Sequence, residues 1–179
     1  MTKMVVVFHS AYGHTQRMAQ FVAEGAQASL VEINEDGLVD ESGWSLLDQA
    51  QGIIFGSPTY MGVVSWQFKR FADTSSKQWY SRGWQDKIAG GFTISANLSG
   101  DKLSTLQYFI TLAMQHGMIW VGQSSHSEGD VNRLGSYSGV MAQVGSTQSA
   151  SEINQGDLET AKAYGQRLLT LTQSLHSNH

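Results

Sequence analysis

Short apolar runs alternate along this chain with segments of helical spacing, and this alternation constrains the fold more than any other feature. The first run, Met-Val-Val-Val-Phe, has no polar residue and is typical of a parallel strand buried on both faces. Strands separated by helices predict an α/β fold, in which helices cover both faces of a parallel sheet. Strands are expected over residues 4–8, 30–33, 52–56, 87–95 and 118–121.

Helical spacing is clearest around residues 106–114, where apolar side chains recur at positions i, i+3, i+4, i+7 and i+8. The pair Ser57-Pro58, which contains the only proline of the chain, is expected to end the third strand at Gly56. Further helices are expected over residues 15–28, 44–51, 65–79 and 161–175.

The segment from Gly122 to Gln155 does not fit this alternation. It is rich in Gly and Ser, and a connection of this length is uncommon in a compact domain unless it has a function. We expect it to leave the sheet edge and to include a short returning strand near residues 140–144; disorder is the alternative. Because the chain has 179 residues, a single domain over residues 1–179 is expected.

Composition excludes several classes of function. The chain has no cysteine, which excludes disulfides, iron–sulfur clusters, thiolate zinc sites and a cysteine nucleophile. The net charge is −4 and no basic cluster is present, so neither a nucleic acid nor an anionic membrane surface is an expected partner. The histidines show no metal-ligand spacing, so no metal site is expected. No apolar run is long enough for a signal peptide or a membrane span, so a cytoplasmic protein is expected.

Charged residues are scarce, at 15% of the chain against about 25% in typical proteins. The cores of protein interfaces are depleted of charge in the same way. We therefore expect copies of the chain to cover part of its surface. A surface rich in uncharged polar side chains is the alternative.

The loop between the first strand and the first helix is the first candidate ligand site. It reads Ser-Ala-Tyr-Gly-His-Thr, in which Ser10 and Thr15 offer hydroxyl groups and Gly13 permits a sharp turn. Ligands of doubly wound sheets bind outside the carboxyl ends of the strands, and free N–H groups at a helix N-terminus bind anions. The loop is therefore expected to hold a phosphate without help from Lys or Arg. An ordinary polar turn, with Thr15 near the helix cap, is the alternative.

Two further loops follow strands at the same sheet edge. Residues 56–62 read Gly-Ser-Pro-Thr-Tyr-Met-Gly, and residues 95–100 read Ser-Ala-Asn-Leu-Ser-Gly. Three such loops would form a shallow cleft lined by main-chain amides, with the aromatic rings of Tyr12, Tyr60 and Trp79 nearby. This suits a flat, phosphorylated ring system. The alternatives are a partly exposed loop aromatic for Tyr60 and a helix-end residue for Trp79.

Other nucleotide and hydrolase motifs are absent. The sequence has no Walker loop, no G-x-G-x-x-G after a strand and no G-x-S-x-G elbow. A P-loop nucleotide site, a Rossmann dinucleotide site and a serine hydrolase are therefore disfavoured.

Three segments resemble the flavodoxin superfamily, and specifically its WrbA-type NAD(P)H:quinone oxidoreductases. They are Phe-His-Ser-Ala-Tyr-Gly-His-Thr at 8–15, Ile-Ile-Phe-Gly-Ser-Pro-Thr-Tyr-Met-Gly at 53–62 and Gln-His-Gly-Met at 115–118. The resemblance covers the chain from Val5 to the last helix. It implies a flavodoxin-like doubly wound sheet of five parallel strands in the order 2-1-3-4-5, with FMN at the switch between the first and third strands.

The resemblance also implies roles for individual residues. His116 matches a histidine that borders the flavin and is the candidate catalytic residue, while Tyr12 and Trp79 match residues near the nucleotide and quinone site. The implied cofactor-binding residues lie in the three loops and are Ser10, Ala11, Tyr12, Gly13, His14, Thr15, Pro58, Thr59, Tyr60, Met61, Gly62, Ser95, Ala96, Asn97 and Gly100, together with His116.

The activity that the resemblance implies is transfer of two electrons from NADH or NADPH, through FMN, to a quinone. It also implies homodimers or homotetramers whose sites are assembled from more than one subunit. Two alternatives stay open. One is a one-electron carrier flavodoxin, although the strongly acidic face of such carriers is missing here. The other is a non-enzymatic binding module with the same fold.

The chain departs from the family pattern in three places. Thr59-Tyr60-Met61 stands where the family often has Thr-Arg-Phe, so a basic contact beside the cofactor is missing. Residues 96–100 replace a Gly-rich loop, and the family's insertion after the second strand is short here, at residues 34–43.

Overall fold

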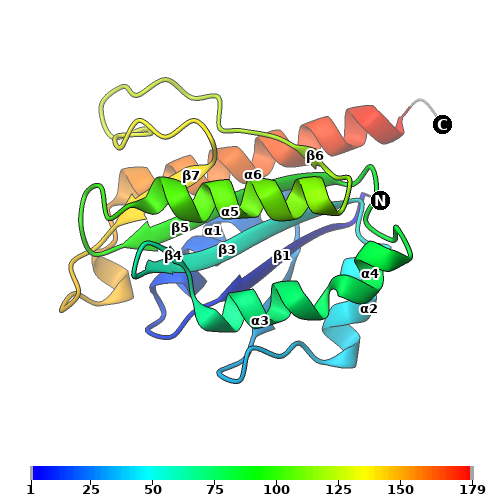
Figure 1. Ribbon diagram of the computed structural model, residues 1–179. Coiled ribbons are helices and arrows are strands. Elements are labelled where there is room, and N and C mark those ends of the chain that lie inside the picture. Colours follow the sequence, from blue (N-terminus) through cyan, green and yellow to red (C-terminus); the bar gives the residue numbers. More distant parts are fainter. Residues whose placement is uncertain (1, 178–179) are drawn as a thin grey trace.

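The computed structural model describes residues 2–177, in which strands and helices alternate as predicted (Figure 1). The strands are β1 (Met4–His9), β2 (Ser29–Ile33), β3 (Gly52–Tyr60), β4 (Val63–Val64), β5 (Ile88–Ser95), β6 (Ile119–Trp120) and β7 (Val140–Gln143). The helices are α1 (His14–Ala26), α2 (Glu41–Gln49), α3 (Trp66–Thr74), α4 (Ser76–Tyr80), α5 (Lys102–Gln115) and α6 (Gln155–His176), with a short 3₁₀ turn, η1 (Ala150–Glu152).

The central sheet is parallel and has the order β2-β1-β3-β5-β6. β4 is a two-residue strand that pairs antiparallel with the end of β3. Without β4, the observed order is the predicted order 2-1-3-4-5, so the flavodoxin-like α/β fold is confirmed.

Side chains that alternate along the buried strands build a core on each face of the sheet. Val6, Phe8 and Ile54 face α1 and α6 in one core. Val7 and Phe55 face the other core, which includes apolar side chains of α2, α3 and α5. Figure 1 shows the sheet between these two sets of helices.

The fifth position of the sheet is filled by two short strands. β6 pairs with the beginning of β5, and β7 pairs with its end, from Phe92 to Ser95. Residues 121–139 leave the sheet edge between them and return, as predicted. Hydrogen bonds hold this excursion: Trp120 Nε1 donates to Ser138 O at 2.9 Å, and the N–H of Asn132 donates to Thr160 Oγ1 at 2.9 Å.

Two sequence predictions are wrong in detail. β3 does not end at Gly56 but continues through Pro58, which pairs with Ile94 of β5. β1 has its last partner in β3 at Gly56, so the missing N–H of Pro58 breaks no bond on that side. The expected helix 65–79 is divided at Ser75, whose hydroxyl donates to Ala72 O at 2.7 Å, a local bond that bends helices.

Within residues 2–177, no helix combines the length and the hydropathy needed to cross a bilayer.

Candidate functional site

A cleft of about 180 Å³ lies at the carboxyl ends of the strands, where the three predicted loops meet. Its predicted lining residues are Ser10, Ala11, Tyr12, His14, Thr15, Pro58, Thr59, Tyr60, Ser95 and Ala96. Gly13, Met61, Gly62, Asn97 and Gly100 lie in the same loops without lining the hollow. Ile94, Val144 and Ser146 also line it, and the sequence reasoning missed them.

The loop from Ser10 to Thr15 presents free donors to this cleft. Gly13 precedes α1 with φ +82°, a left-handed conformation that favours glycine, and the hydroxyl of Ser10 accepts from the N–H of Gln16 at 3.1 Å. In the part of the chain that the structure describes, the main-chain N–H groups of residues 11–15 make no hydrogen bond. They are the unsatisfied donors of a helix N-terminus, and together with the helix dipole they favour an anion.

His14 joins the loop 10–15 to the segment that follows β7. Its Nε2 lies 2.8 Å from the carbonyl oxygen of Gln148. Since a carbonyl only accepts, Nε2 carries the proton and donates. The contact explains how Val144 and Ser146 come to line the cleft, because the loop 145–149 is drawn against the start of α1. The Gly- and Ser-rich composition of this segment was the sequence feature that could have indicated its place at the cleft.

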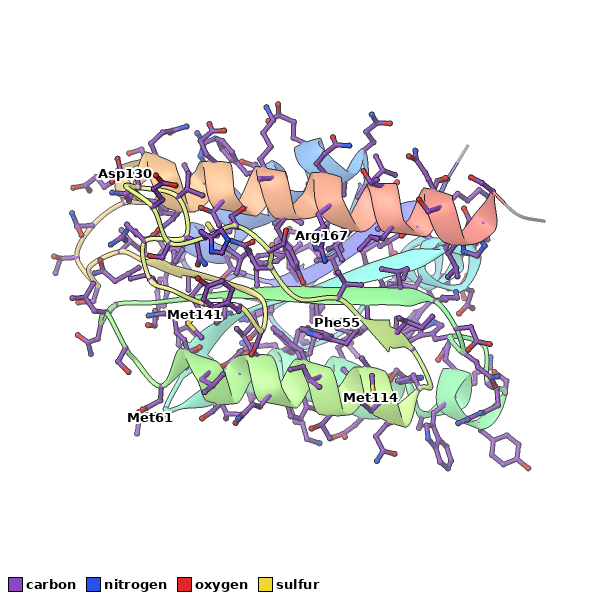
Figure 2. All side chains as sticks on the ribbon, turned by 90° about the horizontal axis from the view of Figure 1, so that it is seen from above. Phe55, Met61, Met114, Asp130, Met141 and Arg167 are labelled. Atoms are coloured by element: carbon purple, nitrogen blue, oxygen red, sulfur yellow. The ribbon has the colours of Figure 1, made fainter. Side chains whose placement is uncertain are left out.

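The second wall of the cleft is the end of β3. The hydroxyl of Thr59 lies 2.8 Å from those of both Thr93 and Thr105, so this side chain points into the protein. Burial, and then the nearby Tyr12, raise the pKa of Tyr60. The phenol of Tyr60 therefore stays neutral and offers its ring face to the cleft. Met61 is fully exposed and projects away from the body of the protein (Figure 2).

The third wall is the loop after β5, and a lysine that the sequence reasoning missed holds it. Lys102 is fully buried, and its Nζ donates to Ser95 Oγ, Asn97 O and Leu98 O at 2.7–2.9 Å. Burial lowers its pKa to about 8. The signal was present, because Lys102 lies four residues before Leu106 and seven before Phe109, on the buried stripe of α5.

His116 and Trp79 are not in this cleft. Both line a second hollow between the α3–α4 break and the end of α5. The N–H of Asp86 donates to Gly117 O, which places this end of α5 beside the beginning of β5. His116 and Trp79 thus lie toward the end of β5 opposite the cleft. Figure 2 likewise places Met61 and Met114 at opposite ends of α5.

His116 is neutral in this structure. Its imidazole is buried, and Nε2 lies 2.9 Å from Ser75 Oγ. The Ser75 proton is used on Ala72 O, so Nε2 donates and the buried Nδ1 holds a lone pair without a partner. Burial, assisted by Arg82, lowers the pKa of His116 to about 4. Its ring centroid lies 4.4 Å from that of Trp84.

Comparison with known proteins shows the family of this chain. A family model described as NADPH-dependent FMN reductase matches residues 3–130. The chain is 53% identical to Flavodoxin FldP of Pseudomonas aeruginosa, over 99% of this chain and 100% of that protein. It is 30% identical to an NAD(P)H dehydrogenase (quinone) of Rhizobium rhizogenes, over 98% and 99% of the two chains.

A solved structure is also similar. The flavodoxin, WrbA-like protein from Agrobacterium tumefaciens is 50% identical and superposes with a TM-score of 0.83, over 97% of this chain and 99% of that one. The matched length covers all three loops of the cleft. The chain belongs to the NADPH-dependent FMN reductase family, as a WrbA-type member of the flavodoxin superfamily.

Proposed function

We propose that this protein binds FMN in the cleft and passes two electrons from NADH or NADPH to a quinone. The observation that carries the proposal is the N-terminus of α1, where the N–H groups of residues 11–15 make no hydrogen bond in the described chain and the cleft is lined by this loop. No Lys or Arg lines the cleft, so the donor set fits a phosphate held by dipoles and hydrogen bonds.

The residues of the cleft would divide the binding of FMN between them. Ser10 and Thr15 lie with the free N–H groups at the phosphate end. Pro58 and Tyr60 on one wall, and Ser95 and Ala96 on the other, would hold the flat ring between β3 and β5. Bound FMN would supply the redox chemistry, and the protein would supply position and an open face for the two substrates.

A second copy of the chain is part of this proposal. His116 and Trp79 lie too far from the cleft of their own chain to contact a ligand there, so their predicted roles require the cleft of another copy. Exposed apolar side chains rim the cleft, with Met61, Tyr12 and Leu98 at 102%, 76% and 66% exposure. Together with the low charge content, this rim favours a homodimer or homotetramer, in a cytoplasmic enzyme.

A one-electron carrier is the second candidate function. The 53% identity to a protein named as a flavodoxin favours it, and the same exposed rim would serve a docked redox partner. In that case the cleft would bind FMN without turning over nicotinamide nucleotides.

Two measurements test the proposal. A visible absorption spectrum after reconstitution with FMN should show bound flavin, and NADH or NADPH oxidation should accelerate when benzoquinone is added. Bound flavin without nucleotide oxidation would support the carrier instead. No bound flavin would contradict both candidates and favour the binding module.

A further inference from the structure

Lys102 is the least expected charged residue in the protein. It is the first residue of α5 and has no exposed surface. No carboxylate lies within ion-pair distance of it in residues 2–177; the nearby carboxylate of Asp157 is already paired with Arg133 at 2.7 Å. A buried ammonium without a counter-ion is costly unless its donors are satisfied, and here three loop oxygens satisfy them.

Side-chain hydrogen bonds hold the carbonyl groups of the loop after β5 toward the protein interior. Lys102 binds the carbonyl oxygens of Asn97 and Leu98, while Gln143 Nε2 donates to Ala96 O at 2.7 Å. Three successive carbonyl groups are therefore held by side chains. In contrast, the main-chain N–H groups of residues 96–101 make no hydrogen bond in the described part of the chain.

We propose that Lys102 is a positioning residue for the flavin: it fixes the loop 95–98 so that its free N–H groups face the ring of a bound FMN. The inference rests on the proposed binding of FMN in the cleft, which this loop borders through Ser95 and Ala96. Lys102 itself would not contact the cofactor. It acts through the loop, and its bonds to the carbonyl groups also make the neighbouring N–H groups stronger donors.

The charge of Lys102 adds a second effect. An ammonium one loop away from the cleft stabilises negative charge there, and a flavin becomes more negative on reduction. Lys102 therefore favours the reduced form of bound FMN. A purely structural lysine would hold the loop without a measurable effect on the reduction potential.

The chain offers a matched control in Lys87. Its Nζ donates to two main-chain carbonyls, Leu47 O and Asp48 O, at 2.8 and 2.7 Å. Burial lowers its pKa to about 8, as for Lys102. Lys87 adjoins the beginning of β5, at the end of the sheet opposite the cleft. It shares the chemistry of Lys102 but not its location.

The test compares Lys102→Met and Lys87→Met in the full chain. For each, the Kd of the apoprotein for FMN is measured by quenching of flavin fluorescence, and the midpoint potential of bound FMN by spectroscopic titration. We expect Lys102→Met to weaken FMN binding by about tenfold and to make the potential more negative. Lys87→Met should leave both within error of the unchanged protein. Equal Kd and potential in Lys102→Met and the unchanged protein would overturn the inference.

Gln143→Leu provides the second variant if Lys102→Met does not fold. It removes the inward bond to Ala96 O without removing a charge. It should weaken FMN binding by about threefold and leave the potential unchanged. An unchanged Kd in this variant would overturn the role of the tethered loop. Failure of the unchanged protein to bind FMN would instead contradict the proposed function.

Discussion

Nε2 of His116 lies 2.9 Å from the hydroxyl oxygen of Ser75, and this hydrogen bond joins the end of α5 to the break between α3 and α4. The bond fixes the tautomer of a histidine that lies at the end of the sheet opposite the cleft of its own chain. Any contact of His116 with a flavin must therefore cross an interface between copies. This relationship makes the oligomer and the chemistry testable together.

The first prediction concerns that contact. In the FMN-loaded protein, His116→Ala should lower the rate of quinone reduction about tenfold or more, because a polar group beside the ring is lost. FMN should stay bound, since none of the residues that line the cleft is changed. Stopped-flow reduction of benzoquinone measures the rate, with light scattering to show that the assembly is intact. The exposed His126 is the control position, and an unchanged rate in His116→Ala would remove this residue from the mechanism.

The second prediction follows from the buried, neutral imidazole. Its pKa is about 4 in the folded protein and about 6.5 when unfolded, so between these values the unfolded chain binds a proton that the folded chain does not. The free energy of unfolding should therefore decrease as the pH falls from about 6.5 to about 4, by up to about 3 kcal/mol from this group. Urea unfolding across this range measures it. His116→Gln should flatten the dependence of the free energy of unfolding on pH, and His126→Gln should not. If His116→Gln and the unchanged protein show the same dependence, His116 is not the group responsible.

The third prediction tests the turn that exposes the N–H groups of α1. Gly13→Ala places a side chain at φ +82°, with a strain of about 1–2 kcal/mol. Relaxation of the loop should move the donors and weaken FMN binding by about tenfold. Gly135→Ala is the control, because Gly135 also has a positive φ, +65°, in open space away from the cleft. Both variants should lose stability on heating, but only Gly13→Ala should lose affinity in a fluorescence titration.

The sequence predicted the sheet and the three loops well because both depend on local patterns. Buried parallel strands are continuous apolar runs, and the loop at 10–15 has its glycine where the chain must turn. It missed Lys102 because a lysine is ordinarily a surface residue, and only its place on the buried stripe of α5 indicates otherwise.

The remaining misses depend on tertiary contacts. Val144 and Ser146 reach the cleft through the bond from His14 to Gln148, which spans 134 residues of sequence. Ser75, where the expected helix divides, also contacts His116, which is 41 residues away. The helical or strand periodicity of a segment does not predict contacts between residues so far apart in the sequence. The strand through Pro58 is possible only because β1 ends beside Gly56, which is a property of the sheet rather than of the segment.

The fourth prediction concerns the anchor of the excursion 121–139, which precedes β7. Asp157 is buried and accepts from Arg133 at 2.7 Å and from the N–H of Gln143 at 3.1 Å. Arg133→Leu would leave this carboxylate buried with one donor, so the free energy of unfolding should fall by about 3 kcal/mol or more. Lys69→Leu removes the cation of an exposed pair with Asp73 and should change it by less than about 0.5 kcal/mol. Urea unfolding at pH 7 compares the two, and similar small losses would show that the Arg133–Asp157 pair does not anchor the excursion to α6.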